Sequence, residues 1–196
     1  LQEENCRCIR VKPGGEFSVV DESCYQIDRG KADNFRSLIK SIDKLEIQIV
    51  DIFFLYGGEK TSRQDLESVA GKMEDYFNRG VYSLLNLIRA LDERFHRAKR
   101  LFVVTANALF TPGDDHVAFE TCSVSGFLKS VTLELDWLHC CHIDLDDWSV
   151  SADAHSQSLI REWKNPADVK EIAYRNGQRL LPVLSNVDMD KEEVLD

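Results

Sequence analysis

Short apolar runs recur along the chain and predict the strands of a sheet. Three of them are rich in β-branched and aromatic residues, as is typical of buried strands. They are LEIQIVDIFFLY (45–56), LFVVTANAL (101–109) and LHCCHIDLD (138–146). We expect the first to be a central strand, buried on both faces toward its end. Shorter extended pieces are expected at CRCIRVK (6–12), whose apolar and polar residues alternate, and at KEIAYR (170–175) and RLLPVL (179–184).

Between these runs, apolar residues recur every three or four positions, which predicts helices. The first helix carries Phe35, Leu38, Ile39 and Ile42, and Asp33 is expected to cap its start. A longer helical segment begins at a capping-box pattern, Thr61 and Gln64. Gly80 is expected to bend or break it. Two more helices are expected, one capped by Asp115 and one near residues 152–163.

Strands that alternate with helices of this length indicate βαβ units and a mainly parallel sheet covered on both faces. We therefore expect an α/β fold of three layers, formed by one domain that spans residues 1–187. Residues 188–196, DMDKEEVLD, form an acidic tail outside that domain.

Charge argues against nucleic acid as a partner. The 24 basic and 34 acidic residues give a net charge of −10, whereas nucleic-acid-binding domains carry a basic patch. The nearest such group is Arg94, Arg97, Lys99 and Arg100, which we interpret as the basic end of a helix, complementing its dipole. No apolar run has the ~18–20 residues of a membrane-spanning helix, so no membrane partner is expected either.

The six cysteines are expected to be reduced, which predicts a cytoplasmic protein. Cys6 and Cys8 are too close together to bridge comfortably, and a bridge between the adjacent Cys140 and Cys141 would be strained. The chain opens with Leu1 and shows no signal-peptide pattern, so we expect it to come from a longer polypeptide.

The segment LHCCHIDLD could be a metal site or a strand. A strand sends alternate side chains to opposite faces, so its two histidines and two cysteines cannot surround one zinc ion. We favour the strand, although one face could still form a site with the distant Cys6 or Cys8. Asp144 and Asp146 are expected at the carboxyl end of this strand, where α/β proteins often bind ligands. We interpret them as solvated loop acids.

Motifs for cofactor binding and catalysis are missing. The patterns GxGxxG and TGxxxGxG are absent, Pro13-Gly14-Gly15 precedes no expected helix, and Gly57-Gly58 is an isolated pair. Tyr56 and Lys60 have the Tyr-x-x-x-Lys spacing of short-chain reductases, but Tyr56 ends a strand and the one-turn helical geometry would not form. The stretch from Ser123 to Gly126 only partly matches a nucleophile elbow and lies in an expected helix.

The sequence therefore predicts no catalytic, cofactor-binding or metal-binding residue. Two alternatives stay open. A cysteine nucleophile could act with a distant histidine. In a divergent nucleotide- or S-adenosylmethionine-dependent enzyme, Asp51 or Asp144 could hold a ribose hydroxyl.

The order of several segments resembles the N-terminal structural subdomain of ketoreductases from modular, mainly bacterial, polyketide synthases. CRCIRVKPGGEF and CYQID are similar to its opening strand and turn, and RLFVVTANA to its third strand. GVYSLLNLIRAL and SGFLKSVTLELDWLHCCHIDLD are similar to later helical and strand segments, and EIAYRNGQRLLPVL to its closing hairpin. Phe54 and Tyr56 stand where the family often has histidine and tryptophan, and Asn107 stands where an arginine or asparagine is common.

This resemblance implies a truncated Rossmann-like fold that does not bind NADPH. It implies a non-catalytic role, in which the chain braces a catalytic ketoreductase subdomain that follows in the same polypeptide and binds the NADPH, beside neighbouring synthase domains. A free-standing pseudo-ketoreductase module is the alternative within this family. The N-terminal strand, Cys6–Val11, is the expected crossing to the partner, because an unpaired edge invites strand addition.

Overall fold

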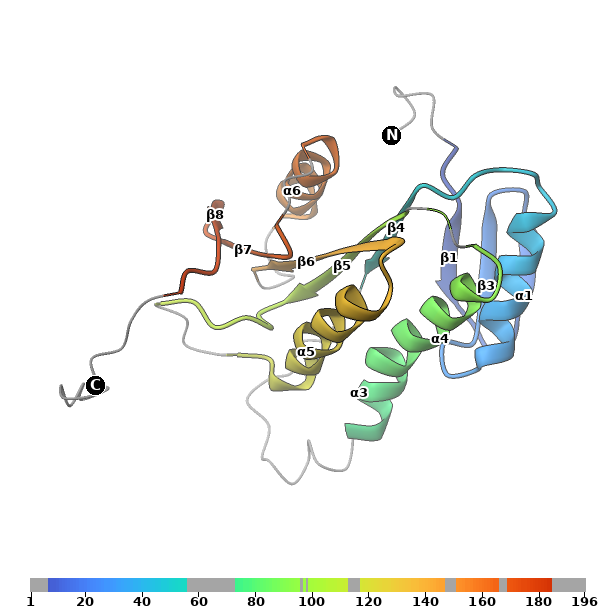
Figure 1. The fold of residues 1–196 in the computed structure, drawn as a ribbon, viewed down its shortest axis with the longest axis horizontal. Coiled ribbons are helices and arrows are strands. Elements are labelled where there is room, and N and C mark those ends of the chain that lie inside the picture. The colour runs from blue at the N-terminus through green and yellow to red at the C-terminus, as the bar shows by residue number, and fades with distance from the viewer. Residues whose placement is uncertain are drawn as a thin grey trace.

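The computed structural model describes residues 7–55, 73–95, 97, 99–112, 117–146, 151–165 and 169–184 (Figure 1). Its strands are β1 Arg10–Pro13, β2 Ser18–Asp21, β3 Cys24–Ile27, β4 Asp51–Leu55, β5 Lys99–Ala106, β6 Leu138–Leu145, β7 Glu171–Arg175 and β8 Gln178–Leu180. Its helices are α1 Ala32–Asp43, α3 Met73–Arg79, α4 Val81–Asp92, α5 Phe119–Glu134 and α6 Ala152–Lys164.

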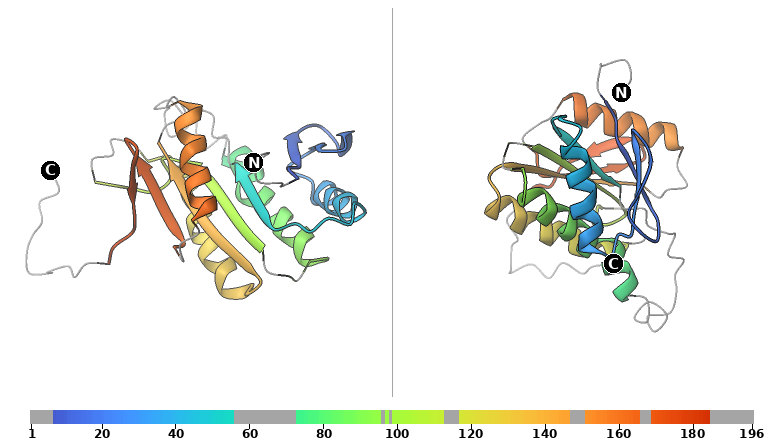
Figure 2. Two further views of the ribbon diagram at one scale, coloured as in Figure 1. Left: turned by 90° about the horizontal axis from the view of Figure 1, so that it is seen from above. Right: turned by 90° about the vertical axis from the view of Figure 1, so that its right-hand side faces the viewer.

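The larger sheet has five strands in the order β4-β5-β6-β7-β8. The first four are parallel, and β8 runs antiparallel to β7 as the closing hairpin. Helices α4 and α5 cover one face and α6 covers the other (Figures 1 and 2). The expected α/β fold with a mainly parallel sheet and three layers is confirmed.

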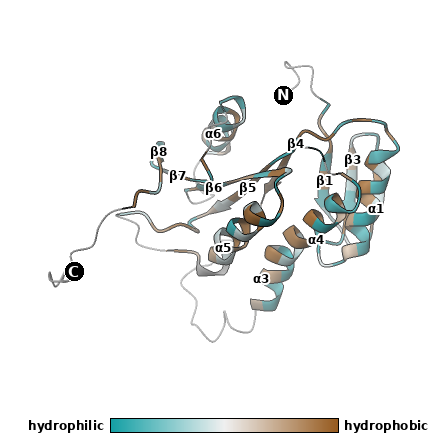
Figure 3. Ribbon diagram, viewed as in Figure 1, coloured by the Kyte–Doolittle hydropathy of each residue, from teal (hydrophilic) through white to brown (hydrophobic). Residues whose placement is uncertain are grey.

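Alternation along the central strands supplies both helix-covered faces. Leu101 and Val103 of β5 pack in the core beneath α4 and α5. Phe102 and Val104 of the same strand pack in the core beneath α6. Figure 3 shows hydrophobic residues along β5 and β6 and on the helices beside them. Both faces are buried, so these runs look continuously apolar in the sequence.

A second, three-stranded sheet in the order β1-β3-β2 forms a separate lobe with α1. Tyr25 and Ile27 of β3 pack with α1 and with the α4 residues Leu87 and Leu91. Two ion pairs fasten the same helices, Arg36 to Glu93 at 2.9 Å and Arg94 to Asp43 at 3.2 Å.

The segment 45–56 differs from its expectation. Strand β4 begins only at Asp51 and pairs only with β5, so among the described strands it is an edge strand and not a central one. Its last residue, Leu55, is 58% exposed. The apolar residues before it, Ile47 and Ile49, pack against the core of the α1 lobe. The run is therefore apolar because it crosses two cores, and not because one strand is buried throughout.

The helix boundaries are confirmed in part. Gly80 does separate α3 from α4. Asp33 is not a cap, since α1 starts after Lys31 and Asp33 pairs with Arg36 within the first turn. The N-cap position of helix α5 is Ala118. Asp115, Thr61, Gln64, Cys6 and the tail 188–196 lie outside the described residues.

Candidate functional site

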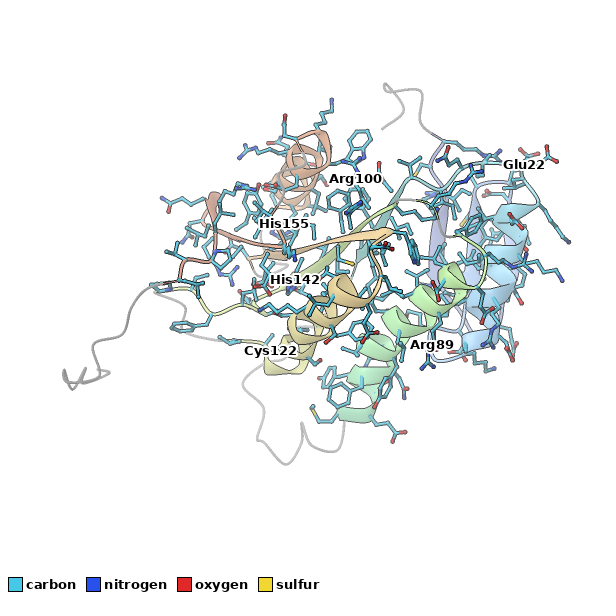
Figure 4. All side chains as sticks on the ribbon, in the orientation of Figure 1. Glu22, Arg89, Arg100, Cys122, His142 and His155 are labelled. Carbon is cyan, nitrogen blue, oxygen red and sulfur yellow. The ribbon has the colours of Figure 1, made fainter. Side chains whose placement is uncertain are left out.

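Four polar side chains meet inside the fold near the carboxyl ends of β5, β6 and β7. Thr105 comes from β5, His142 and Asp144 from β6, and Arg175 from the end of β7. Thr105 and Asp144 are opposite each other in the β5–β6 register. All four are buried, Asp144 completely, and Figure 4 shows His142 beside α5. In α/β proteins this end of the sheet is where ligands bind.

Asp144 uses its full capacity to accept hydrogen bonds. Oδ1 accepts from the Thr105 hydroxyl at 2.6 Å and the Ala108 N–H at 2.8 Å. Oδ2 accepts from the Leu109 N–H at 3.0 Å and Arg175 Nη2 at 2.7 Å. An ionised carboxylate has about four acceptor positions, so none is left for a ribose hydroxyl. The interpretation of Asp144 as a solvated loop acid is wrong.

Asp146 lies just after β6 and is partly buried. Its carboxylate accepts the Asn176 N–H at 2.8 Å. The bond fixes the turn of the β7–β8 hairpin, so this acid has a structural contact as well as access to solvent.

His142 acts as a neutral donor. The Thr105 hydroxyl has one hydrogen, which it donates to Asp144, so its 2.8 Å contact with His142 Nε2 must be accepted from the ring N–H. Burial lowers the pKa of His142, and the nearby carboxylates of Asp144 and Glu171 only partly oppose this. His142 Nδ1 is then an acceptor, and it has no hydrogen-bond partner among the described residues.

Glu171, beside His142 in the register, connects β7 to α5. It accepts a hydrogen bond from Ser125 and lies 3.1 Å from Lys129 Nζ. Burial acts to raise the pKa of Glu171, but the bonds from Ser125 and Lys129 outweigh it, and the pKa is lowered. Ser125 belongs to the partial nucleophile elbow, which does lie within α5. Its hydroxyl donates a hydrogen bond to the Glu171 carboxylate.

Two further hydrogen-bond networks lie on the α6 side of the sheet. The Asp51 carboxylate accepts two hydrogen bonds from Arg100, at 2.6 and 2.8 Å, and one from Trp163 Nε1 at 2.7 Å. Glu162 accepts from Arg179 Nε at 2.7 Å and the Tyr174 hydroxyl at 2.5 Å. Asp51 begins a strand and does not follow one, so it is far from the position expected of a ribose-binding acid.

The four basic residues between Arg94 and Arg100, expected at the end of a helix, are only partly placed as expected. Arg94 follows the end of α4 at Asp92, but Lys99 and Arg100 belong to β5. Burial, followed by the neighbouring Arg97, lowers the pKa of Lys99, whose Nζ lies 4.9 Å from the centre of the Phe95 ring. Lys99 and Arg100 are therefore structural parts of the sheet, whereas Arg94 pairs with Asp43 of α1.

LHCCHIDLD forms the strand β6, as predicted. Cys140 packs in the core beneath α5 and Cys141 in the core beneath α6, so the two thiols point to opposite faces. Burial raises the pKa of both to about 12, which makes them poor nucleophiles and metal ligands at neutral pH. Within the described ranges, no three histidine, cysteine or acidic side chains come together as a metal site would require.

The remaining motif residues are placed as follows. Pro13 ends β1, Gly14 and Gly15 follow it before β2, and the three precede no helix, as expected. Tyr56, Gly57, Gly58 and Lys60 lie outside the described residues. Asn107 follows β5 with a left-handed φ of 53°. No described helix is long and apolar enough to cross a membrane.

A cleft of 390 Å³ lies at the opposite end of β6, where that strand extends beyond the start of β7. Its polar lining includes Arg100, Asp136, His139, Glu162 and Lys170. Arg100 and Glu162 are already held by the α6-side networks. The cleft is at the amino ends of the parallel strands, away from the usual ligand position in α/β folds.

Comparison with known proteins identifies the family. The model of the family described as beta-ketoacyl synthase-like, N-terminal, matches residues 1–162. The chain belongs to this family. A search of curated proteins gave no match.

Solved structures share the fold. A multidomain structure of a keto acid-selecting NRPS module, containing adenylation, ketoreductase and pseudo-Asub domains, aligns with a TM-score of 0.84 at 22% identity over 94% of this chain. An N-terminal ketoreductase from the macrolactin assembly line aligns with a TM-score of 0.68 at 16% identity, also over 94%. The family member described here spans only 15% and 37% of those two chains.

Structures of short-chain dehydrogenases/reductases are similar as well. One from Vibrio parahaemolyticus aligns with a TM-score of 0.58 at 16% identity, over 76% of this chain and 75% of its own. The fold is therefore that of short-chain dehydrogenases and reductases, in agreement with the expected Rossmann-like architecture.

Proposed function

We propose that the chain is a non-catalytic structural subdomain in the ketoreductase region of a modular polyketide or hybrid peptide–polyketide synthase. Its role is to brace the NADPH-binding catalytic subdomain of the same polypeptide. The family membership supports this, as does the high structural similarity to two assembly-line proteins with ketoreductase regions, of which the chain spans a minor part. Residues 1–187 form the subdomain, and residues 188–196 lead toward the catalytic part.

The main support for this proposal is that protein side chains fill the carboxyl ends of the parallel strands. A nucleotide-binding Rossmann fold leaves a crevice at this edge, where backbone N–H groups hold the pyrophosphate. Here Asp144 and Arg175 form a buried ion pair at the carboxyl ends of β6 and β7, and the carboxylate accepts the Ala108 and Leu109 N–H groups. A pyrophosphate would meet a buried negative charge there. We therefore assign no cofactor and no catalytic residue to this chain.

We propose that strand β1 forms the contact with the catalytic part, by pairing with one of its strands. Arg10 N–H donates to the carbonyl of Ser23, the residue before β3, so the Arg10 backbone faces β3. Backbone groups of successive residues face opposite edges, and those of Val11 therefore face outward. Among the described strands β1 has no partner on that edge, and Val11 is 41% exposed. An added strand would pair with the Val11 N–H and C=O groups.

Co-expression with the following catalytic part of the parent polypeptide tests the role. We expect a complex that survives size exclusion, with an interface on the order of 600–1,500 Å². Val11→Pro removes the outward N–H and should weaken association at least tenfold, whereas Val11→Thr keeps it and should bind normally. Circular dichroism checks that both variants fold. If the unmodified chain and the catalytic part do not associate, the bracing role is wrong; if Val11→Pro binds normally, only the assignment to β1 is wrong.

A further inference from the structure

The turn after β5 has the geometry of an anion-binding site. Asn107 adopts the left-handed conformation, and the next two N–H groups, of Ala108 and Leu109, both donate to one carboxylate. Consecutive N–H groups that converge in this way form a concavity that favours anions. Arg175 Nη2 supplies a positive charge to the same group at 2.7 Å, and the Thr105 hydroxyl completes the donors at 2.6 Å.

We propose that this turn, with Thr105 and Arg175, is a binding site for a small carboxylate anion, and that the Asp144 side chain is its built-in occupant. The occupant closes the strand ends to anions from solution. Removal of the side chain would open the site while leaving its donors in place. Formate or acetate could then bind where the Asp144 carboxylate was.

Fixed backbone donors separate this site from an ordinary ion pair. Two of the four donors to Asp144 are N–H groups, and the Asn107 N–H holds the same turn to the Leu145 carbonyl at 3.1 Å. Asp51 provides the contrast, because its donors among the described residues are all on the side chains of Arg100 and Trp163. Those side chains can turn away when the carboxylate is removed.

The charges around the site favour a monovalent anion. Among the described residues, Arg175 is the one cation that contacts the carboxylate. On the α5 side, Lys129 Nζ is paired with the Glu171 carboxylate at 3.1 Å, and the neutral His142 ring donates to the Thr105 hydroxyl, which itself donates to Asp144. A carboxylate has the same single charge as the Asp144 side chain that it would replace, whereas a doubly charged phosphate would bring a further charge into a buried place.

Chemical rescue tests the proposal. The melting temperature of Asp144→Ala is measured in 100 mM sodium formate, sodium acetate or sodium chloride. A site with a dissociation constant of about 10 mM would shift the folding equilibrium about tenfold in formate. We expect formate and acetate to raise the melting temperature of this variant above its value in chloride. Asp144→Asn should not respond, because its amide fills the site, and neither should Asp51→Ala.

Three results would overturn the proposal. They are no response of Asp144→Ala to any carboxylate, an equal response to chloride, and an equal response of Asp51→Ala. If Asp144→Ala is recovered only unfolded, its refolding yield in formate is compared with its yield in chloride. Equal yields would also contradict the proposal. In a folded variant, formate should also shift the amide NMR signals of Ala108 and Leu109 more than those of other residues.

Discussion

Replacement of Arg175 by methionine tests how the strand ends are held together. Methionine keeps much of the apolar stem and removes the guanidinium. The change deletes the 2.7 Å bond to Asp144 and a second 2.7 Å bond to the Leu109 carbonyl. It also deletes the 3.0 Å bond from Nη1 to the Tyr174 carbonyl. The carboxylate left behind is completely buried.

The expected cost follows from that burial. Removal of one partner from a buried ion pair typically costs about 3–5 kcal/mol, because the remaining charge is uncompensated. Asp144 still keeps the hydrogen bonds from Thr105, Ala108 and Leu109, so we expect a value near the lower end. A loss of about 3 kcal/mol corresponds to a melting temperature lower by roughly 6–12 °C for a chain of this size.

Urea unfolding of the single and double variants measures this directly. Arg175→Met should lose about 3 kcal/mol of unfolding free energy. The double variant Arg175→Met, Asp144→Asn should be less destabilised than the sum of its single variants, with a coupling energy of about 2 kcal/mol. A loss below about 1 kcal/mol, or additive single effects, would show that the charge pair does not hold this end of the sheet.

Four further predictions concern other parts of the fold. Gly126→Ala should stabilise the chain by about 0.5–1 kcal/mol in urea unfolding, because an added Cβ meets nothing within 4 Å on this exposed helical position; a destabilised variant would contradict the open space. Trp163→Phe should lower the unfolding free energy by about 1 kcal/mol, because it removes the hydrogen bond from Nε1 to Asp51. An unchanged unfolding free energy would refute that contribution. The folded pKa of His142 lies below its unfolded value of about 6.5, so its contribution to stability is present above that pH and is lost as the pH falls. His142→Gln should therefore flatten the decline in unfolding free energy between about pH 7 and 5.5, and an unchanged slope would count against a buried neutral ring. Iodoacetamide at pH 8 should modify exposed Cys8 well before Cys141, whose pKa is about 12. Mass spectrometry should find Cys141 labelled only after unfolding. Equal labelling rates for the two thiols would contradict this prediction.

The sequence predicted the sheet well where a whole apolar run forms one continuous strand. Residues 101–106 and 138–145 lie within single strands whose alternate side chains enter the two cores on either face. The run 45–56 was misjudged for a physical reason, since its first half packs in the α1 lobe and only Asp51–Leu55 joins the sheet. Apolar periodicity reports burial and does not say which core provides it.

The polar cluster was only partly visible in the sequence. Asp144 stood out as an acid near a strand end, but its partners Thr105 and Arg175 are 39 and 31 residues away from it. No spacing rule connects them, because the register of three parallel strands brings them together. The absence of a glycine-rich loop could be read directly, whereas the side chains that fill the strand ends could not.

Direct titration with NADPH tests the central claim, that the strand ends of this chain are closed to a nucleotide. Equilibrium dialysis of the folded chain against NADPH should show no saturable binding up to about 1 mM. The same titration of the catalytic part gives the positive control. Saturable binding by this chain with a dissociation constant below about 100 µM would contradict the account, since it would require an open phosphate site where Asp144 and Arg175 now lie.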